Sequence, residues 1–313
     1  MKRCLLLGIA IMLLVSVGGV VGCGPTTVTF PDANLESVIR EAIEKPEGPI
    51  YPADLEGLTE LRVFERNITD LRGMDKCTNL TRLFLLENQI SDISPLTSLT
   101  NLAELALSGN QITDISPLAS MNNLVTLDLS QNPVEDISPL ASLTNLTRLG
   151  LIEIEISDLS PLASLIGLIS LDLSANQLSD ISPLASLINL KSLILMFNQI
   201  EDLSPLASLS SLITLDLPFN QIRDISPLAS LTELTRLNLM GSPESNQIED
   251  ISALGSLTNL TEVRLWNNQI SDVSPLADLP NLRTLWILQG NPLNDESLNV
   301  YIPQLKERGV DVH

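Results

Sequence analysis

The 313-residue sequence predicts an α/β-type repeat solenoid, a curved stack with a parallel β-sheet on its concave side and short helical turns on its convex side. Three observations support this fold class. An Asn recurs at a spacing of 22 residues, leucines alternate at the period of a β-strand shortly before each Asn, and a Ser-Pro-Leu segment follows it. Because one such unit cannot bury its leucine face alone, successive units must stack.

The unit at residues 102–118 shows the pattern clearly. Leu105 and Leu107 alternate before Asn110, which predicts a strand with one buried face that pairs in parallel with its neighbours. The Asn amide is expected to turn inward and satisfy backbone groups of a tight turn. Ser116 is expected to be the N-cap of a short outer helical turn, with proline at its first position. The recurring residues are Asn88, Asn110, Asn132, Asn176, Asn198, Asn220, Asn246, Asn268 and Asn291.

This pattern resembles the bacterial leucine-rich repeat of internalin type, which has a 22-residue period and an Asp-Ile-Ser-Pro-Leu segment in its second half. The resemblance covers residues 58–293 in about eleven copies, the first of them degenerate. It implies a leucine-rich repeat horseshoe that recognises another protein and is not an enzyme. Internalin-like proteins recognise host receptors, but no residue of this chain points to a host.

Both ends of the solenoid are expected to carry a cap, because an open end would expose the core. Residues 30–57 form the predicted helical N-terminal cap, with a helix that starts at Asp32 and continues to about Lys45. Residues 294–313 form the predicted C-terminal cap, in which a helix is expected to be interrupted at Pro303.

The N-terminus has the organisation of an export signal, with Lys2 and Arg3 followed by an apolar run. The segment Val-Val-Gly-Cys that ends at Cys23 resembles the bacterial lipobox. This resemblance implies a signal peptide at residues 1–22, lipid on Cys23, a short tether at residues 23–29, and an exported protein anchored to the cell membrane or outer membrane. The apolar run is also just long enough for an uncleaved transmembrane anchor, which stays as the alternative.

Composition excludes several functions. The formal net charge is −21, so the chain repels phosphate backbones, and no nucleic-acid partner is expected. The sequence contains a single His, His313, and three Cys. These residues cannot supply a His-based catalytic triad, a zinc cluster or a disulfide framework, so neither an enzyme nor a cofactor is expected.

An Asp also recurs in register, immediately before each Ser-Pro-Leu segment. It is expected to accept backbone hydrogen bonds where the chain turns; a calcium site is the weaker alternative, because calcium needs six to eight oxygens. A second set, Asp128, Asp172 and Asp216, is expected to be solvated on the concave face. Ile154 replaces the repeated Asn once, which predicts a loosened turn near the middle of the solenoid.

The alternate strand residues that face the concave surface are the candidate binding residues. Aromatic and Arg residues, which are enriched at binding hot spots, gather there in repeats seven to eleven. The predicted protein-binding residues are Ile194, Met196, Phe197, Phe219, Arg236, Asn238, Met240, Arg264, Trp266, Trp286 and Leu288, and a secondary cluster consists of Arg62, Phe64, Arg82, Phe84 and Leu86.

Plainer roles are open for several of these residues. Trp286 and Leu288 lie in the last repeat, where they could pack under the C-terminal cap, and Phe197 and Phe219 could tuck between repeats. The four-residue insertion at 242–245 could form one wall of the site or be an idle loop. The alternatives to a protein ligand are a glycan that stacks on the aromatic rings, and a structural or self-associating scaffold.

Overall fold

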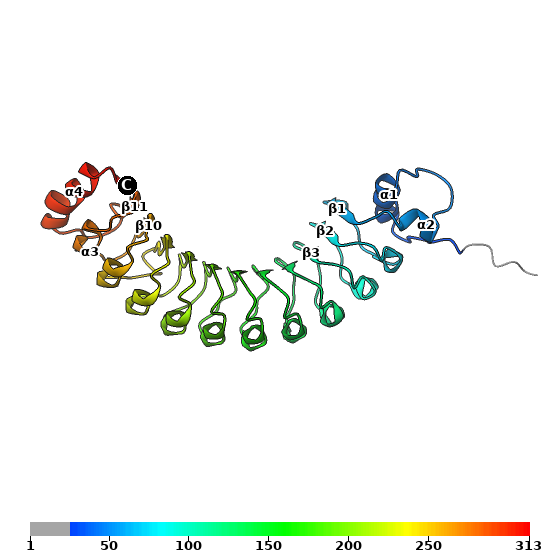
Figure 1. Cartoon of the computed structure of the whole chain (residues 1–313), viewed down its shortest axis with the longest axis horizontal. Coiled ribbons are helices and arrows are strands. Elements are labelled where there is room, and N and C mark those ends of the chain that lie inside the picture. Colours follow the sequence, from blue (N-terminus) through cyan, green and yellow to red (C-terminus); the bar gives the residue numbers. More distant parts are fainter. Residues whose placement is uncertain (1–25) are drawn as a thin grey trace, which may run out of the picture.

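The computed structural model describes residues 26–313, and these form one curved solenoid (Figure 1). Twelve strands pair in chain order into a single sheet along the inner side of the curve, and short helical turns follow the outer side (Figure 1). The predicted parallel-sheet solenoid is thus confirmed. The predicted signal peptide and Cys23 lie outside the described residues.

The strands are short and all parallel. They are β1 (Glu60–Phe64), β2 (Arg82–Leu86), β3 (Glu104–Ala106), β4 (Thr126–Asp128), β5 (Arg148–Gly150), β6 (Ser170–Asp172), β7 (Ser192–Ile194), β8 (Thr214–Asp216), β9 (Arg236–Asn238), β10 (Glu262–Arg264), β11 (Thr284–Trp286) and β12 (Asp311–Val312). Equivalent residues pair across repeats, for example Leu105 with Leu127. The inward leucines are fully buried in one core that runs from Val28 to Val312.

The outer turns are mainly 3-10 helices. They are η1 (Met74–Lys76), η2 (Ser94–Leu96), η3 (Ser116–Ser120), η4 (Ser138–Ser142), η5 (Ser160–Ser164), η6 (Ser182–Ser186), η7 (Ser204–Ser208), η8 (Ser226–Ser230) and η9 (Ser252–Ser256), with a short α-helix, α3 (Ser274–Ala277), in the last repeat. The expectation that Ser116 is an N-cap is wrong, because it is the first residue of η3. Asp114 caps the turn instead: its carboxylate accepts hydrogen bonds from the Ser116 N–H at 2.8 Å and hydroxyl at 3.0 Å.

The same backbone hydrogen bond to the repeated Asp recurs in every repeat that carries the residue. The acceptors are Asp70, Asp92, Asp114, Asp136, Asp158, Asp180, Asp202, Asp224, Asp250 and Asp272. The structural role expected for this column is confirmed. From Asp92 onward, each carboxylate holds the first backbone amide of the following turn, which has no partner within the helix.

The repeated Asn side chains link successive repeats, as expected. Asn132 accepts a hydrogen bond from the Ile112 N–H of the preceding repeat at 3.0 Å. Its amide donates to the Leu107 carbonyl of that repeat at 2.9 Å and to the Leu129 carbonyl of its own at 3.0 Å. One buried side chain thus serves three backbone groups that face away from water.

We call this series of bridging Asn side chains the Asn ladder, and Ile154 interrupts it. An Asn at position 154 would accept a hydrogen bond from the Val134 N–H of the preceding repeat. In its absence, the Val134 N–H donates to the Asn132 carbonyl two residues back, at 2.8 Å. Ile154 itself is fully buried, and its N–H donates to Asn176 at 3.0 Å. The loosened turn stays a prediction, and it now centres on one amide.

The N-terminal cap consists of α1 (Ala33–Ala42) and a single turn, α2 (Pro52–Leu55). Asp32 is the N-cap of α1 and accepts from the Asn34 and Leu35 amides at 2.9 and 3.0 Å. Its second oxygen accepts from the Thr69 N–H at 2.8 Å, which ties the cap to the first repeat.

The C-terminal cap is helical through Pro303, which corrects the expected interruption. A π-helical turn, η10 (Ser297–Tyr301), leads directly into α4 (Ile302–Glu307). Pro303 stands in the first turn of α4, where its missing N–H breaks no α-helical bond. The chain then adds β12 beside β11, and the C-terminus lies next to β11 in Figure 1. Within residues 26–313, no helix is long and apolar enough to cross a bilayer.

Candidate functional site: the concave face

Repeats seven to eleven place the predicted binding residues in two adjacent rows. The strand row runs along one register of the sheet and consists of Ile194, Asp216, Asn238, Arg264 and Trp286. The exit row lies where the strands end and contains Met196, Pro218, Met240, Trp266 and Leu288. The N–H of the residue after an exit position donates to the carbonyl of the exit residue in the next repeat, as Phe197 does to Pro218 and Phe219 does to Met240. These bonds hold neighbouring exit positions in register. The structure therefore brings the late predicted residues onto one continuous surface.

Phe197 and Phe219 follow the exit row and form a stacked pair. Their ring centroids are 4.6 Å apart with 13° between the ring planes. Phe197 is 52% exposed and Phe219 is half-buried, so the rings do not tuck between the repeats. Both residues have a positive φ, 56° and 57°, as do the equivalent residues of most other repeats.

The Arg residues of this surface are ion-paired. Glu262 contacts Arg236 at 3.1 Å and Arg264 at 2.7 Å, while the Arg264 guanidinium lies 4.6 Å from the centre of the Trp286 ring. Composition suggested a concave face more basic than the rest of the chain, but Glu262 offsets much of this charge locally. The ion pair between Glu262 and Arg236 could have been predicted from the sequence, because the two residues occupy equivalent positions of adjacent strands.

The C-terminal residue meets both tryptophans. The His313 ring stacks on Trp286 with centroids 5.1 Å apart, and the His313 carbonyl accepts a 3.4 Å hydrogen bond from the indole of Trp266. The two indoles themselves meet edge to face at 6.2 Å. Trp286 thus packs partly against the cap, as the plainer role proposed, yet both indoles are still half-exposed, and Leu288 beside them is exposed.

The secondary cluster lies apart from this surface. Arg62 and Arg82 both pair with Glu60, and the Arg62 guanidinium lies 4.7 Å from the centre of the Phe84 ring. Phe64 is exposed and Leu86 is half-buried. From β2 to β7 is five strand spacings, or roughly 24 Å, so the two clusters form separate patches.

Between the clusters, the concave Asp residues are half-buried, not simply solvated as expected. Asp128 and Asp172 accept hydrogen bonds from the N–H groups two residues on, Ser130 and Ser174, both at 3.0 Å. Burial raises the pKa of Asp172, and the negative charges of Asp128 and Asp216 raise it further. This middle section is therefore small and acidic, and it offers little apolar contact area.

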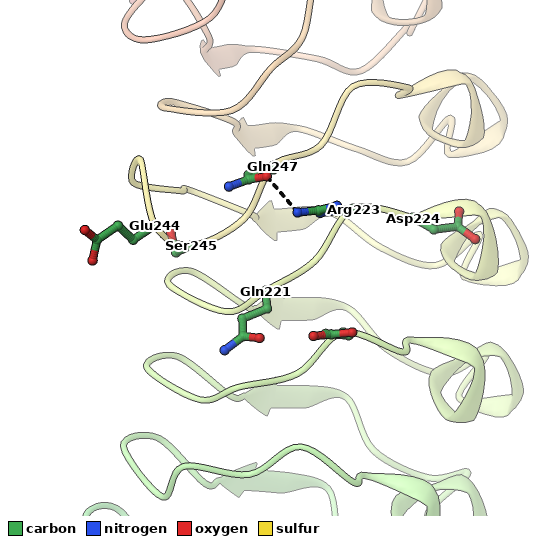
Figure 2. Close-up of a pocket in the computed structure, with 7 residues that line it drawn as sticks. Gln221, Arg223, Asp224, Glu244, Ser245 and Gln247 are labelled. Atoms are coloured by element: carbon green, nitrogen blue, oxygen red, sulfur yellow. Dashed lines mark hydrogen bonds between the residues drawn. The ribbon is translucent and has the colours of Figure 1, made fainter.

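The insertion at 242–245 walls a groove on the side of the solenoid and not on the concave face (Figure 2). The groove encloses about 430 Å³, and in Figure 2 Arg223 lies at its centre, with a 3.1 Å hydrogen bond to Gln247. Its lining is polar throughout: Glu201, Gln221, Arg223, Asp224, Glu244, Ser245 and Gln247. None of the predicted concave residues borders it.

Comparisons with known proteins agree with this architecture. The family model described as leucine-rich repeats (2 copies) matches residues 78–120, 100–142, 122–164, 166–208, 210–256 and 258–300. No curated protein matches the chain.

Several solved structures are similar. An internalin (inlF) from Listeria monocytogenes has 35% identity and a TM-score of 0.78, over 93% of this chain and 92% of that one. An internalin C2 (inlC2) from the same organism has 38% identity and a TM-score of 0.53, over 82% and 94%. A leucine-rich repeat protein of Leptospira interrogans, at 23% identity and a TM-score of 0.69 over 83% and 73%, shares the fold. This chain belongs to the leucine-rich repeat family and is of the internalin-like type.

Proposed function

We propose that this protein is a lipid-anchored, non-enzymatic recognition module of the bacterial cell envelope, which binds a protein partner through the concave face of repeats seven to eleven. Leucine-rich repeat proteins are generally protein-interaction modules, and the internalin-like fold is typically non-enzymatic. The observation that carries the proposal is the stacked pair of Phe197, which is exposed, and Phe219, which is half-buried, on this face.

The repeat position of these two residues argues that the rings have a role of their own. The equivalent residue has a positive φ in most repeats, and the chain otherwise fills this position with Glu65, Glu87, Gly109, Gln131, Glu153, Ala175 and Asn267. None of these is aromatic, and at Phe197 the substitution leaves half of a large apolar ring in water.

The surroundings of the pair fit a protein interface. The apolar residues Met196 and Met240 flank it, and the Arg236–Glu262–Arg264 ion pairs lie beside it along the sheet. An apolar centre with Arg, Trp and flexible Met side chains around it is the composition of a binding hot spot. Exposed apolar patches of this kind are typical of contact surfaces.

A glycan ligand is the second candidate, because the half-exposed indoles of Trp266 and Trp286 offer faces on which a sugar ring can stack. The two candidates depend on different residues. A protein partner requires the phenylalanine pair and the arginines, whereas a glycan requires chiefly the indoles.

The test uses the chain from residue 24, since residues 26–313 contain both caps and the whole described core. The double variant Phe197→Asn and Phe219→Asn removes the rings and introduces the residue that Asn267 already supplies at this backbone position. The matched control is Leu298→Gln with Val300→Gln, which removes two exposed apolar side chains from the C-terminal cap.

Immobilised wild type, double variant and control are exposed to proteins of the producing cells and their surroundings. A partner retained by wild type and control and lost with the double variant supports the proposal. Equal retention by all three proteins contradicts it. Retention of glycans that depends on Trp266 and is unaffected by the double variant favours the sugar-binding candidate.

The lipid anchor has its own test. Wild type is expected to enter the detergent-rich phase of a membrane extract, and Cys23→Ser is expected to lose this behaviour together with the added mass of the lipid. A Cys23→Ser variant that still partitions with membranes would contradict lipid anchoring.

A further inference from the structure

A second apolar surface lies on the side of the solenoid where the chain returns from each outer turn to the next strand, which we call the return flank. Five of its residues in repeats four to eight are large, apolar and exposed: Val125, Ile166, Ile169, Ile188 and Ile213. Ile166 and Ile188 are 58% and 53% exposed, more than either ring of the concave pair. None of these residues belongs to the concave face.

Backbone hydrogen bonds show how these residues are arranged along the flank. The Lys191 N–H donates to the Ile169 carbonyl, and the Ile213 N–H donates to the Lys191 carbonyl, both at 2.9 Å, so these three residues occupy consecutive repeats. Ile166 and Ile188 are equivalent residues of repeats six and seven, linked through the 2.9 Å bond from Asn189 to the Ile166 carbonyl. The four isoleucines therefore gather in repeats six to eight, with Lys191 between Ile169 and Ile213, and we call them the isoleucine patch.

The return stretches of these five repeats lack carboxylates. Each stretch runs from the outer turn to the first strand residue, at 116–126, 138–148, 160–170, 182–192 and 204–214. These 55 residues contain no Asp or Glu and only two basic residues, Arg148 and Lys191. The same stretch ends with Glu104 in repeat three and contains Glu233 in repeat nine. In a chain of net charge −21, a surface without carboxylates lowers the repulsion that a second copy meets.

Gly167 marks the middle of the patch. Most repeats have Asn at this position, and its amide donates to the carbonyl of the preceding repeat, as Asn145 does to Asn122 at 2.8 Å. Gly167 has no such side chain. The absence of a polar side chain here adds to the apolar character of the surface.

We propose that the return flank of repeats four to eight is a self-association surface, on which two copies of this chain pair about a two-fold axis. A two-fold interface uses the same patch on both copies, so it needs a largely apolar surface that does not add to the repulsion between two acidic chains. The return stretches of these repeats carry no carboxylate, and their two basic residues, Arg148 and Lys191, are opposite in sign to the net charge of the chain. The concave faces stay outside the interface, so the inference goes beyond the proposed recognition function and does not depend on it.

The test compares the mass of the chain from residue 24 over a concentration series by sedimentation equilibrium. The principal variant carries Ile166→Thr, Ile169→Thr, Ile188→Thr and Ile213→Thr. Threonine is what the chain itself places at equivalent positions, at Thr144 and Thr147 for example, so the fold is preserved. Gly167→Asn is a second variant, because a Cβ there would meet its neighbours at ordinary distances of 3.4 and 3.5 Å. The cap variant with Leu298→Gln and Val300→Gln is the control.

Wild type and control are expected to form dimers, and the threonine variant is expected to raise the dissociation constant at least a hundredfold. Added salt is expected to strengthen the wild-type dimer, because it screens the repulsion between two acidic chains. A wild type that is monomeric at every concentration overturns the proposal, as does a threonine variant that dimerises like wild type. Capture of an acidic protein or of lipid vesicles by a monomeric wild type, lost in the threonine variant, would assign the patch to those partners instead and would also overturn it.

Discussion

The substitution Asn220→Ala removes one bridging Asn side chain and tests how much these side chains contribute to the stability of the solenoid. Asn220 is 1% exposed. It accepts from the Ile200 N–H at 3.1 Å and donates to the Leu195 and Leu217 carbonyls at 2.9 and 3.1 Å. These three groups belong to two successive repeats, so the substitution weakens their interface.

The loss of stability depends on which backbone groups lose their only hydrogen-bond partner. The Leu195 carbonyl also accepts from Asn198, and the Leu217 carbonyl also accepts from Asn246, so each keeps one hydrogen bond. The Ile200 N–H loses its acceptor in a buried site. One orphaned amide and two weakened carbonyls give a loss of about 2–4 kcal/mol in the free energy of unfolding. Asn220→Ile is expected to cost less, because the side chain fills the space and Val134, in the repeat of Ile154, shows an amide that turns to a local carbonyl.

Urea unfolding followed by circular dichroism measures the change, with Gln221→Ala, an exposed neighbour, as the control. Hydrogen exchange at the Ile200 amide gives a local measure if the repeats cease to unfold together. A loss below about 0.5 kcal/mol, no larger than that of the control, would refute the role given to the ladder.

Four further predictions concern the rest of the solenoid. The Val134 amide is expected to exchange with solvent faster than the equivalent amides of neighbouring repeats, and equal rates would contradict the loosened turn. Burial raises the pKa of Asp172 above its ordinary value of 3.8, so its contribution to stability is present below 3.8 and is lost as the pH rises through the raised pKa; Asp172→Asn should be more stable than wild type at pH 7 and equal to it in acid, in urea titrations at each pH. The backbone N–H bond lowers the pKa of Asp158, so its contribution is present above 3.8 and is lost as the pH falls through the lowered pKa; Asp158→Asn should flatten this part of the acid unfolding curve. A Cβ on Gly241 would overlap backbone carbonyls of adjacent segments, so Gly241→Ala should cost about 3 kcal/mol in thermal unfolding, whereas Gly57→Ala, in open space, should be nearly neutral.

The fold could be predicted because the same residues recur at the same structural positions in every repeat. The inward positions of Leu105 and Leu107, the bridging role of Asn110 and the Asp before each outer turn follow from spacing and from the needs of buried backbone groups. The role of Ser116 was assigned wrongly because two neighbouring residues, Asp and Ser, can both cap a turn. The capping carboxylate was recognised from the same segment, so the error concerned one residue and not the turn.

The candidate site could be predicted only in part, since a sequence gives the row in which a residue lies but not its contacts along that row. Arg236 and Arg264 could be placed on the concave face from the sequence, but their shared ion pairs with Glu262 could not. The contact between Trp286 and His313 forms because β12 joins the sheet beside β11. A strand of only two residues has no periodic pattern from which it could be predicted.

Departures from the chain's own repeat are the most informative positions, because every other copy shows what the fold by itself requires. Phe197 and Phe219 stand where Gln131 and Ala175 occupy the same turn in earlier repeats, and Ile166 stands where Thr144 occupies the preceding repeat. The fold does not require these substitutions, since the other copies form the same turn without them. Ile154 differs, because it is buried and its neighbours compensate for it. The exposed departures therefore indicate contacts made outside the chain, and they form two separate surfaces, one concave and one on the return flank.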